Sequence, residues 1–409
     1  MKKKLIGMIM SAAMVLSLAA CGGAAPEAPA DTAAAAADAA PADSEAPAAD
    51  AAADTGSRAA AAEDMKVAMV TDYGDVTDQS FNQSTYEACK AFCDAGGFEF
   101  TYYKPEGDST AERVAMIDKA VADGYNVVLL PGFAFAEAII EATPMYPDIK
   151  FISLDMTESD LAGAAGTDTY SEPNVFVASY QEELVGYMAG FAAVKMGYTR
   201  LGFLGGMAVP GVMRYGYGFV QGADAAAAED GADVTVNYAY GNQFYGDADI
   251  TAAMDTWYSG GTEVVFACGG AIYTSVAEAA AKVDGKVIGV DVDQAAAIDG
   301  QYGEGMTITS AMKGLGATVE TLLSAIRDGK WDDYAGKVLS LGIVDGENPE
   351  KNYVQLPLNS TIWTDSFTVD DYKAIVAGMA DGSITVSNDI SAGQPSAETV
   401  KINFQGNIK

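Results

Sequence analysis

The feature that most constrains the fold is a rhythm in which short apolar runs alternate with segments of helical periodicity. In the first half of the folded region, strand-like runs occur at 66–71, 98–103, 126–131 and 150–155. Three helical patterns separate these runs: the first ends at Phe92, and the next two cover 111–122 and 135–143. Apolar strands that alternate with helices form parallel sheets covered on both faces. The first half therefore predicts an α/β lobe.

The same rhythm starts again after a helical pattern at 180–195. Strand-like runs follow at 200–206, 233–240, 263–267 and 286–291, with helical patterns at 214–229, 247–259 and 275–282. A further strand at 306–313, a helix at 316–328 and a strand at 337–344 suggest that the chain crosses between lobes. The roughly 345 residues after Asp64 are more than one core usually serves. We expect an N-terminal lobe of 65–190 plus 306–337, a C-terminal lobe of 191–305 plus 338–385, and a loosely held tail at 386–409.

The first 64 residues carry the pattern of an exported, membrane-anchored protein. Three lysines precede an uncharged apolar run that ends at Ala20, which is typical of a signal peptide at 1–20. Leu18-Ala19-Ala20-Cys21 is similar to the bacterial lipobox, which predicts a diacylated Cys21 at the outer face of the cell membrane. The rest of 21–64 is rich in Ala, Pro and Asp, so we expect a disordered tether.

Composition excludes several classes of function. The formal charge is −34, and removal of the three signal lysines makes it −37, which argues against nucleic acid as a partner. The chain contains no His, so catalysis by Ser-His-Asp or Cys-His groups is ruled out. Neither a P-loop nor a dinucleotide-binding glycine motif stands in the proper context. We expect no enzymatic activity, no cofactor and no metal, and we interpret Cys89 and Cys93 as buried residues on one helix face.

Polar residues stand where predicted strands end. Asp72, Asp155, Gly269, Asp291 and Lys313 all lie at the carboxyl ends of predicted strands. In open α/β sheets, ligands bind at this edge. Two facing lobes would bring these residues together around a cleft.

Three ordered segments resemble a known family. They are TDYGDVTDQSFNQS from Thr71 to Ser84, VIGVDVDQ from Val287 to Gln294, and TSAMK from Thr309 to Lys313. They are similar to the basic membrane protein family of ABC transporter substrate-binding lipoproteins, which includes purine nucleoside receptors. The resemblance covers roughly 66–345. It implies a type I periplasmic-binding-protein fold with two Rossmann-like lobes, three crossovers and a hinge, and delivery of a small-molecule ligand to the permease subunits of an ABC importer. We further expect a monomer.

The resemblance also implies roles for single residues. Phe81 and Phe244 would stack on the two faces of a base, while Asn82 and Asp155 would meet its polar groups. Asp291 would accept hydrogen bonds from ribose hydroxyls.

Lys313 would donate hydrogen bonds to the same ribose, and Asp72 and Gly269 complete the candidate set. Some alternatives remain open: Phe81 and Phe244 as core aromatics, and Asp72 as a cap of the following turn or helix. The Gly- and Tyr-rich segment 207–219 either alters the cleft or packs between elements. Other ligand classes are a sugar or an autoinducer-like molecule, and the protein could act as a ligand sensor instead of in transport.

Overall fold

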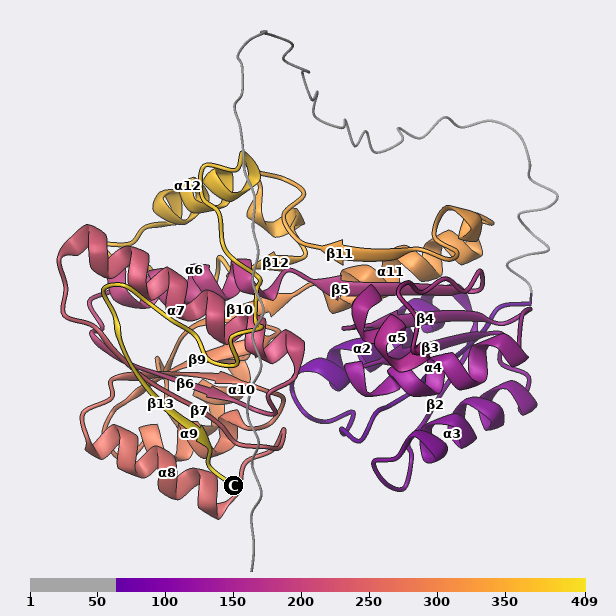
Figure 1. Cartoon of the computed structure of the whole chain (residues 1–409), viewed down its shortest axis with the longest axis horizontal. Helices are drawn as coiled ribbons and strands as arrows, with labels where there is room; N and C mark the ends of the chain where they lie inside the picture. The colour runs from indigo at the N-terminus through magenta and orange to yellow at the C-terminus, as the bar shows by residue number, and fades with distance from the viewer. Residues whose placement is uncertain (1–63) are drawn as a thin grey trace, which may run out of the picture. The chain divides into compact units, whose positions relative to one another are not determined.

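Two sheets organise residues 64–409, which are the residues that the computed structural model describes (Figure 1). One sheet has six strands in the order β11-β5-β4-β3-β1-β2, and the other has seven in the order β12-β10-β9-β8-β6-β7-β13. We call the part built on the six-stranded sheet the first lobe, and the part built on the seven-stranded sheet the second lobe. The arrangement is the expected type I periplasmic-binding-protein fold.

The first lobe has a parallel sheet with helices on both faces. Its strands are β1 (Lys66–Val70), β2 (Glu99–Tyr103), β3 (Val127–Pro131), β4 (Lys150–Leu154), β5 (Val175–Tyr180) and β11 (Val338–Leu341). Its helices are α2 (Phe81–Gly96), α3 (Thr110–Ala122), α4 (Ala136–Ala142), α5 (Glu158–Ala165) and α11 (Leu315–Arg327). Alternate strand residues explain the layers: Val67 and Met69 pack with α2 and α11, whereas Ala68 and Val70 pack with α3, α4 and α5.

The second lobe repeats this plan with one additional strand at one edge. Its strands are β6 (Arg200–Gly205), β7 (Thr235–Tyr240), β8 (Val264–Cys268), β9 (Lys286–Asp291), β10 (Thr307–Lys313), β12 (Val354–Gln355) and β13 (Lys401–Asn407), and β12 is antiparallel to β10. Its helices are α6 (Glu182–Lys195), α7 (Pro210–Asp230), α8 (Ala248–Ser259), α9 (Tyr273–Ala280), α10 (Ala295–Tyr302) and α12 (Val369–Ala380).

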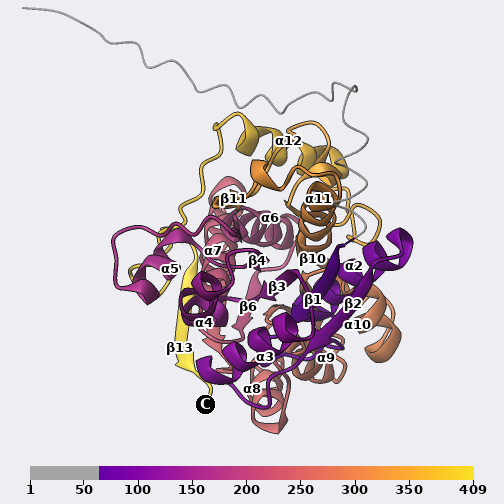
Figure 2. The same ribbon diagram turned by 90° about the vertical axis from the view of Figure 1, so that its right-hand side faces the viewer.

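Short 3-10 turns lie at Phe133–Phe135, Thr143–Met145, Trp331–Asp333 and Pro349–Lys351. Seen from the side, the sheet strands and the helices of the first lobe form separate layers (Figure 2).

Helices α6 and α7 lie against each other through glycine. A Cβ atom added to Gly190 of α6 would lie 2.0 Å from the Phe219 carbonyl oxygen, and one added to Gly222 of α7 would lie 2.0 Å from the Tyr187 carbonyl oxygen. Real Cβ atoms do not approach backbone this closely, so both positions require glycine. The high glycine content around α7 therefore serves helix packing.

The chain crosses between the lobes three times, as expected. It passes from β5 to α6 at Gln181, from β10 to α11 at Gly314, and from β11 to β12. Backbone hydrogen bonds join these segments: the Gln181 amide donates to the Leu341 carbonyl (2.9 Å), and the Gly314 amide donates to the Tyr353 carbonyl (2.7 Å). The three crossings therefore lie side by side, as a hinge requires.

The expected lobe boundaries need correction. Residues 306–337 do not all belong to the first lobe, because β10 pairs with β9 in the second sheet and only the following helix α11 returns to the first. Conversely, β11 pairs with β5, so residues 338–341 belong to the first lobe and not the second. Residues 182–190 were expected in the first lobe, but they belong to helix α6, which packs on α7 and on β10 in the second lobe.

The expected loose tail at 386–409 also needs correction. Residues 401–407 form β13, which pairs in parallel with β7 at the edge of the second sheet. Among the helices of residues 64–409, none is long and apolar enough to cross a membrane. The predicted signal peptide, the predicted lipidation of Cys21 and the predicted tether up to residue 63 lie outside the described residues.

Candidate functional site

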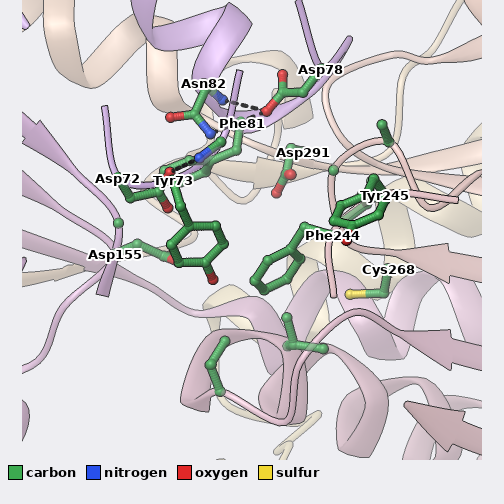
Figure 3. A pocket seen from close by; sticks show the side chains of 18 of the residues that line it. Asp72, Tyr73, Asp78, Phe81, Asn82, Asp155, Phe244, Tyr245, Cys268 and Asp291 are labelled. Carbon is green, nitrogen blue, oxygen red and sulfur yellow. Dashed lines mark hydrogen bonds between the residues drawn. The ribbon is translucent and has the colours of Figure 1, made fainter. Parts of the chain in front are cut away.

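A cleft of about 330 Å³ lies where the carboxyl ends of the strands of both lobes meet. Every predicted ligand-binding residue lines it: Asp72, Phe81, Asn82, Asp155, Phe244, Gly269, Asp291 and Lys313. Figure 3 shows most of these side chains around one space, although they come from distant parts of the sequence. The position at strand ends thus predicted correctly that Asp72, Asp155, Gly269, Asp291 and Lys313 line one cleft.

Two strand-end aspartates occupy corresponding places in the two lobes. Strand β4 has the same place in the first sheet as β9 in the second, and Asp155 directly follows β4 while Asp291 ends β9. Both adopt the left-handed backbone region, with φ of 70° for Asp155 and 65° for Asp291. Aspartate tolerates this region better than most residues, but it still costs free energy, and such strain concentrates at functional sites.

A buried network of charges forms the floor of the cleft. The Lys313 side chain is 4% exposed, and its Nζ lies 2.7 Å from Asp155, 3.3 Å from Glu182 and 3.7 Å from Asp291. Glu182, which is fully buried, also accepts a hydrogen bond from Arg214 Nε at 2.7 Å. Two cations and three carboxylates therefore share one desolvated region.

The pKa values follow from this arrangement. Burial acts to lower the pKa of Lys313, but the carboxylates around it raise that pKa above its ordinary value. Burial acts to raise the pKa of Asp155, yet the Lys313 ammonium outweighs it and the pKa lies below the ordinary value. For Asp291, burial prevails over Lys313 and raises the pKa to about 6. Asp155 is thus the carboxylate that Lys313 holds ionised most firmly.

Several contacts in the cleft connect the two lobes. The Ser80 hydroxyl of the first lobe donates to Asp291 at 2.6 Å, and Gln294 Nε2 of the second lobe donates to the Gln79 carbonyl at 3.0 Å. Together with the ion pair between Lys313 and Asp155, these bonds join the lobes across the cleft.

Aromatic rings form another side of the cleft. The rings of Phe244 and Tyr73 are stacked, with centroids 6.1 Å apart and an interplanar angle of 22° (Figure 3). Phe81 lies beside the charged floor, with the Lys313 Nζ 5.2 Å from its ring centroid. Phe244 is half-buried and lines the cleft, so it is more than a core aromatic.

Polar groups surround the beginning of α2. Asp72 accepts the Gly74 amide at 2.6 Å, so it caps a turn while it also lines the cleft. Burial raises the pKa of Asp72 to about 6. Asn82 is 5% exposed and its Nδ2 donates to Asp78, but its Oδ1 has no hydrogen-bond partner among the described residues. A buried acceptor without a partner is costly unless a ligand supplies a donor.

The sequence analysis missed other residues of this site. Tyr73 and Tyr215 line the cleft, and Tyr215 shows that the Tyr-rich segment contributes to it. Asp78 caps α2, because its carboxylate accepts the amides of Ser80, Asn82 and Gln83. Tyr73 and Asp78 belong to the Thr71–Ser84 segment that resembles the family, so their position could have marked them as site residues. Glu182 lies within a mostly apolar helix, and nothing around it in the sequence marks it as a site residue.

Metal binding has no support in residues 64–409, where no group of three or more suitable ligands occurs. Cys89 and Cys93 are free and buried, as predicted. Cys268 lines the cleft as a free thiol, and burial raises its pKa well above the ordinary value. A thiol in this state is a poor nucleophile.

Comparison with known proteins identifies the class of molecule. Residues 65–349 match the family described as ABC transporter substrate-binding protein PnrA-like. The chain belongs to this family. PnrA-like proteins are ABC transporter substrate-binding proteins, so the family implies a small-molecule ligand and the permease subunits of a transporter as partners.

Individual relatives of this PnrA-like chain agree with the assignment. It is 27% identical over 310 residues to the ABC transporter nucleoside-binding protein BmpA of Lactococcus lactis, and the alignment covers 71% of this chain and 83% of BmpA. It is 26% identical over 292 residues to basic membrane protein B of Borreliella afzelii, covering 69% of this chain and 79% of the relative. An uncharacterised lipoprotein of Pyrococcus furiosus is 24% identical, with 71% of each chain covered.

Solved structures agree with the fold of the PnrA-like chain. A solute-binding protein of an ABC transporter system from Aeropyrum pernix superposes with a TM-score of 0.60 at 21% identity, covering 78% of this chain and 87% of the other. A second solute-binding protein, from Conexibacter woesei, gives a TM-score of 0.59 at 22% identity, covering 79% of this chain and 99% of the other.

Proposed function

We propose that the cleft binds a nucleoside, and preferably a purine nucleoside, for import. The observation that carries the proposal is the division of one cavity into an aromatic side and a charged floor. Phe81, Phe244 and Tyr73 offer flat surfaces, whereas Asp291 and Lys313 offer charged hydrogen-bonding groups. A nucleoside has the same division into a planar base and a hydroxylated sugar.

The base is assigned to the aromatic side. Stacking on aromatic rings contributes about 1–3 kcal/mol per base, and the larger purine ring system gains more contact than a pyrimidine. The Asn82 Oδ1, which lacks a partner among the described residues, and the Asp72 carboxylate are acceptors for amino or ring N–H groups at the base edge. In this assignment Asp155 lies close to both Lys313 and the ligand.

The ribose is assigned to Asp291 and Lys313. Charged partners strengthen hydrogen bonds to hydroxyls, by roughly a factor of two over neutral ones. The carboxylates of Asp72, Asp78, Asp155 and Asp291 in the cleft disfavour a phosphate group. The ligand is therefore a nucleoside and not a nucleotide.

The protein acts as a non-enzymatic, monomeric receptor that delivers this ligand to its transporter. Relatives named lipoproteins and the lipobox-like segment support a diacylated Cys21 that anchors the protein at the outer face of the membrane. Partition of the full-length product into detergent, lost in Cys21→Ala, tests the anchor. An aqueous wild-type product would contradict it.

Calorimetric titration tests the ligand assignment. The protein is unfolded and refolded to remove bound ligand, then titrated with inosine, guanosine, adenosine, cytidine, ribose and inosine monophosphate. We expect purine nucleosides to bind, ribose and the nucleotide to bind far more weakly, and Phe81→Ala to lose about tenfold or more in affinity. Phe92→Ala, on the same helix but stacked on Phe98 outside the cleft, is the matched control.

Three results would each overturn part of the proposal. Binding of ribose as tight as that of inosine would assign the cleft to a sugar. No heat with any nucleoside would move the ligand to another class, such as an autoinducer-like molecule. Ligand binding without uptake defects in a deletion strain would favour a sensor.

A further inference from the structure

Residues 401–409 lie beyond the family match, which ends at residue 349. Residues 401–407 form β13, which covers the outer edge of β7. Figure 1 shows this segment in yellow, and in both views the end marked C lies near α8 (Figures 1 and 2). The corresponding strand of the first lobe, β2, has no described strand on its outer edge. The second lobe thus carries an extra element beside its cleft loops.

This segment reaches the loop that carries Phe244. The loop connects β7 to α8 and spans 241–247. The Ile408 amide donates to the Tyr240 carbonyl at 2.8 Å, where the loop leaves β7. The Lys409 ammonium donates to Gln243 Oε1 at 3.0 Å and pairs with the Asp247 carboxylate, where the loop enters α8. Both ends of the loop are therefore held by residues 408 and 409.

Bonds inside the loop transmit this restraint to Phe244. Gln243 Nε2 donates to the Tyr245 carbonyl at 2.8 Å and to Asp247 at 3.0 Å, so it bridges the residues on either side of Phe244. The Phe244 carbonyl accepts the Ala271 amide at 2.9 Å, which fixes the backbone from the other side. The ring packs against the backbone of Gly206, since a Cβ added to that residue would lie 2.3 Å from Phe244 Cδ1. A small shift of the loop would therefore change where the ring meets a ligand.

We propose that residues 401–409 position the cleft aromatic Phe244, with Lys409 as the residue that fastens its loop. The proposal rests on the cleft as the ligand site. Lys409 bonds to Gln243 and Asp247 and is not among the residues that line the cleft, so it is a positioning residue. Ordering the loop before the ligand arrives lowers the entropy that binding must otherwise remove, which slows ligand dissociation.

The test compares two lysines of the same segment in the full chain. Lys409→Met removes the contact with Gln243 and Asp247, whereas Lys401→Met removes a surface ion pair with Asp233 (2.7 Å) at the other end of β13. Hydrogen exchange of peptides covering 241–250, measured without ligand, should become about two- to fivefold faster in Lys409→Met. Lys401→Met should leave these peptides unchanged, and Lys409→Arg should restore protection.

Ligand dissociation gives the second readout, with inosine as the probe. We expect dissociation from Lys409→Met to be about two- to fivefold faster, and this effect to vanish when Phe244 is already alanine. Equal effects of Lys401→Met and Lys409→Met, or an undiminished Lys409 effect in Phe244→Ala, would overturn the proposal. If inosine does not bind at all, the exchange experiment still decides the positioning role, and only the ligand assignment fails.

Discussion

Replacement of Asp291 by asparagine should make the ligand-free protein more stable while it weakens the ligand site. Burial raises the pKa of Asp291 from 3.8 to about 6, so the folded state binds this proton more tightly than the unfolded state does. The stabilising contribution of the proton is complete below the unfolded value and is lost as the pH rises through the folded value. The ionised carboxylate thus opposes folding at neutral pH.

The two pKa values set the magnitude. Ionisation of Asp291 destabilises the folded protein by about 1–2 kcal/mol at pH 5 and by about 3 kcal/mol at pH 8. Asp291→Asn keeps an acceptor for the Ser80 hydroxyl but carries no charge. Its advantage over the wild type should therefore grow by between about 1 and 2 kcal/mol from pH 5 to pH 8. This is about a tenfold change in the unfolding equilibrium.

Urea denaturation of the ligand-free full chain at both pH values measures this difference. Exposed Asp332→Asn removes the same formal charge from the surface and controls for the change in net charge. The reasoning is refuted if Asp291→Asn is less stable than the wild type by the same amount at both pH values. That result would mean that the attraction between Lys313 and the Asp291 carboxylate outweighs the free-energy cost of burying this charge.

Further changes test the packing and the charge network. Arg214→Met leaves the fully buried Glu182 without the counter-charge that donates to it at 2.7 Å, so we expect a loss of about 3 kcal/mol in urea denaturation. Asp123→Asn, in an exposed pair with Lys119, should leave the midpoint unchanged. A loss no larger than the control's would contradict the network. Gly190→Ala forces a methyl group against the Phe219 carbonyl and should cost about 2–3 kcal/mol, but Gly163→Ala, in helix α5 with open space around it, should stabilise by about 0.5–1 kcal/mol. Equal thermal shifts in the two alanine variants would show that α6 and α7 can move apart.

Much of the fold was predictable because its strands are buried on both faces. A strand such as β3, with every residue buried, must be a continuous apolar run, and such runs are visible in a sequence. Strand β5 was missed because it joins α6 through Gln181 alone, so the helical pattern appeared to begin at Tyr180. Strand β13 was missed because it pairs with only one neighbour and keeps polar residues exposed on both sides.

The lobe boundaries could not be predicted because they depend on which sheet a strand joins. Strands β10 and β11 are both short apolar segments, and nothing local distinguishes the sheet that each one enters. The candidate site was more predictable, since strand ends and three motifs placed its residues independently. Glu182 was hidden because its partners Arg214 and Lys313 come from distant elements, and only the folded chain brings them together.

A crystal structure of the refolded protein with inosine tests the central claim most directly. The account predicts the base against Phe81 and Phe244, and the ribose hydroxyls within hydrogen-bond distance of Asp291 and Lys313. The ligand in the reverse orientation, with its sugar on the aromatic side, or bound outside this cleft, would contradict it.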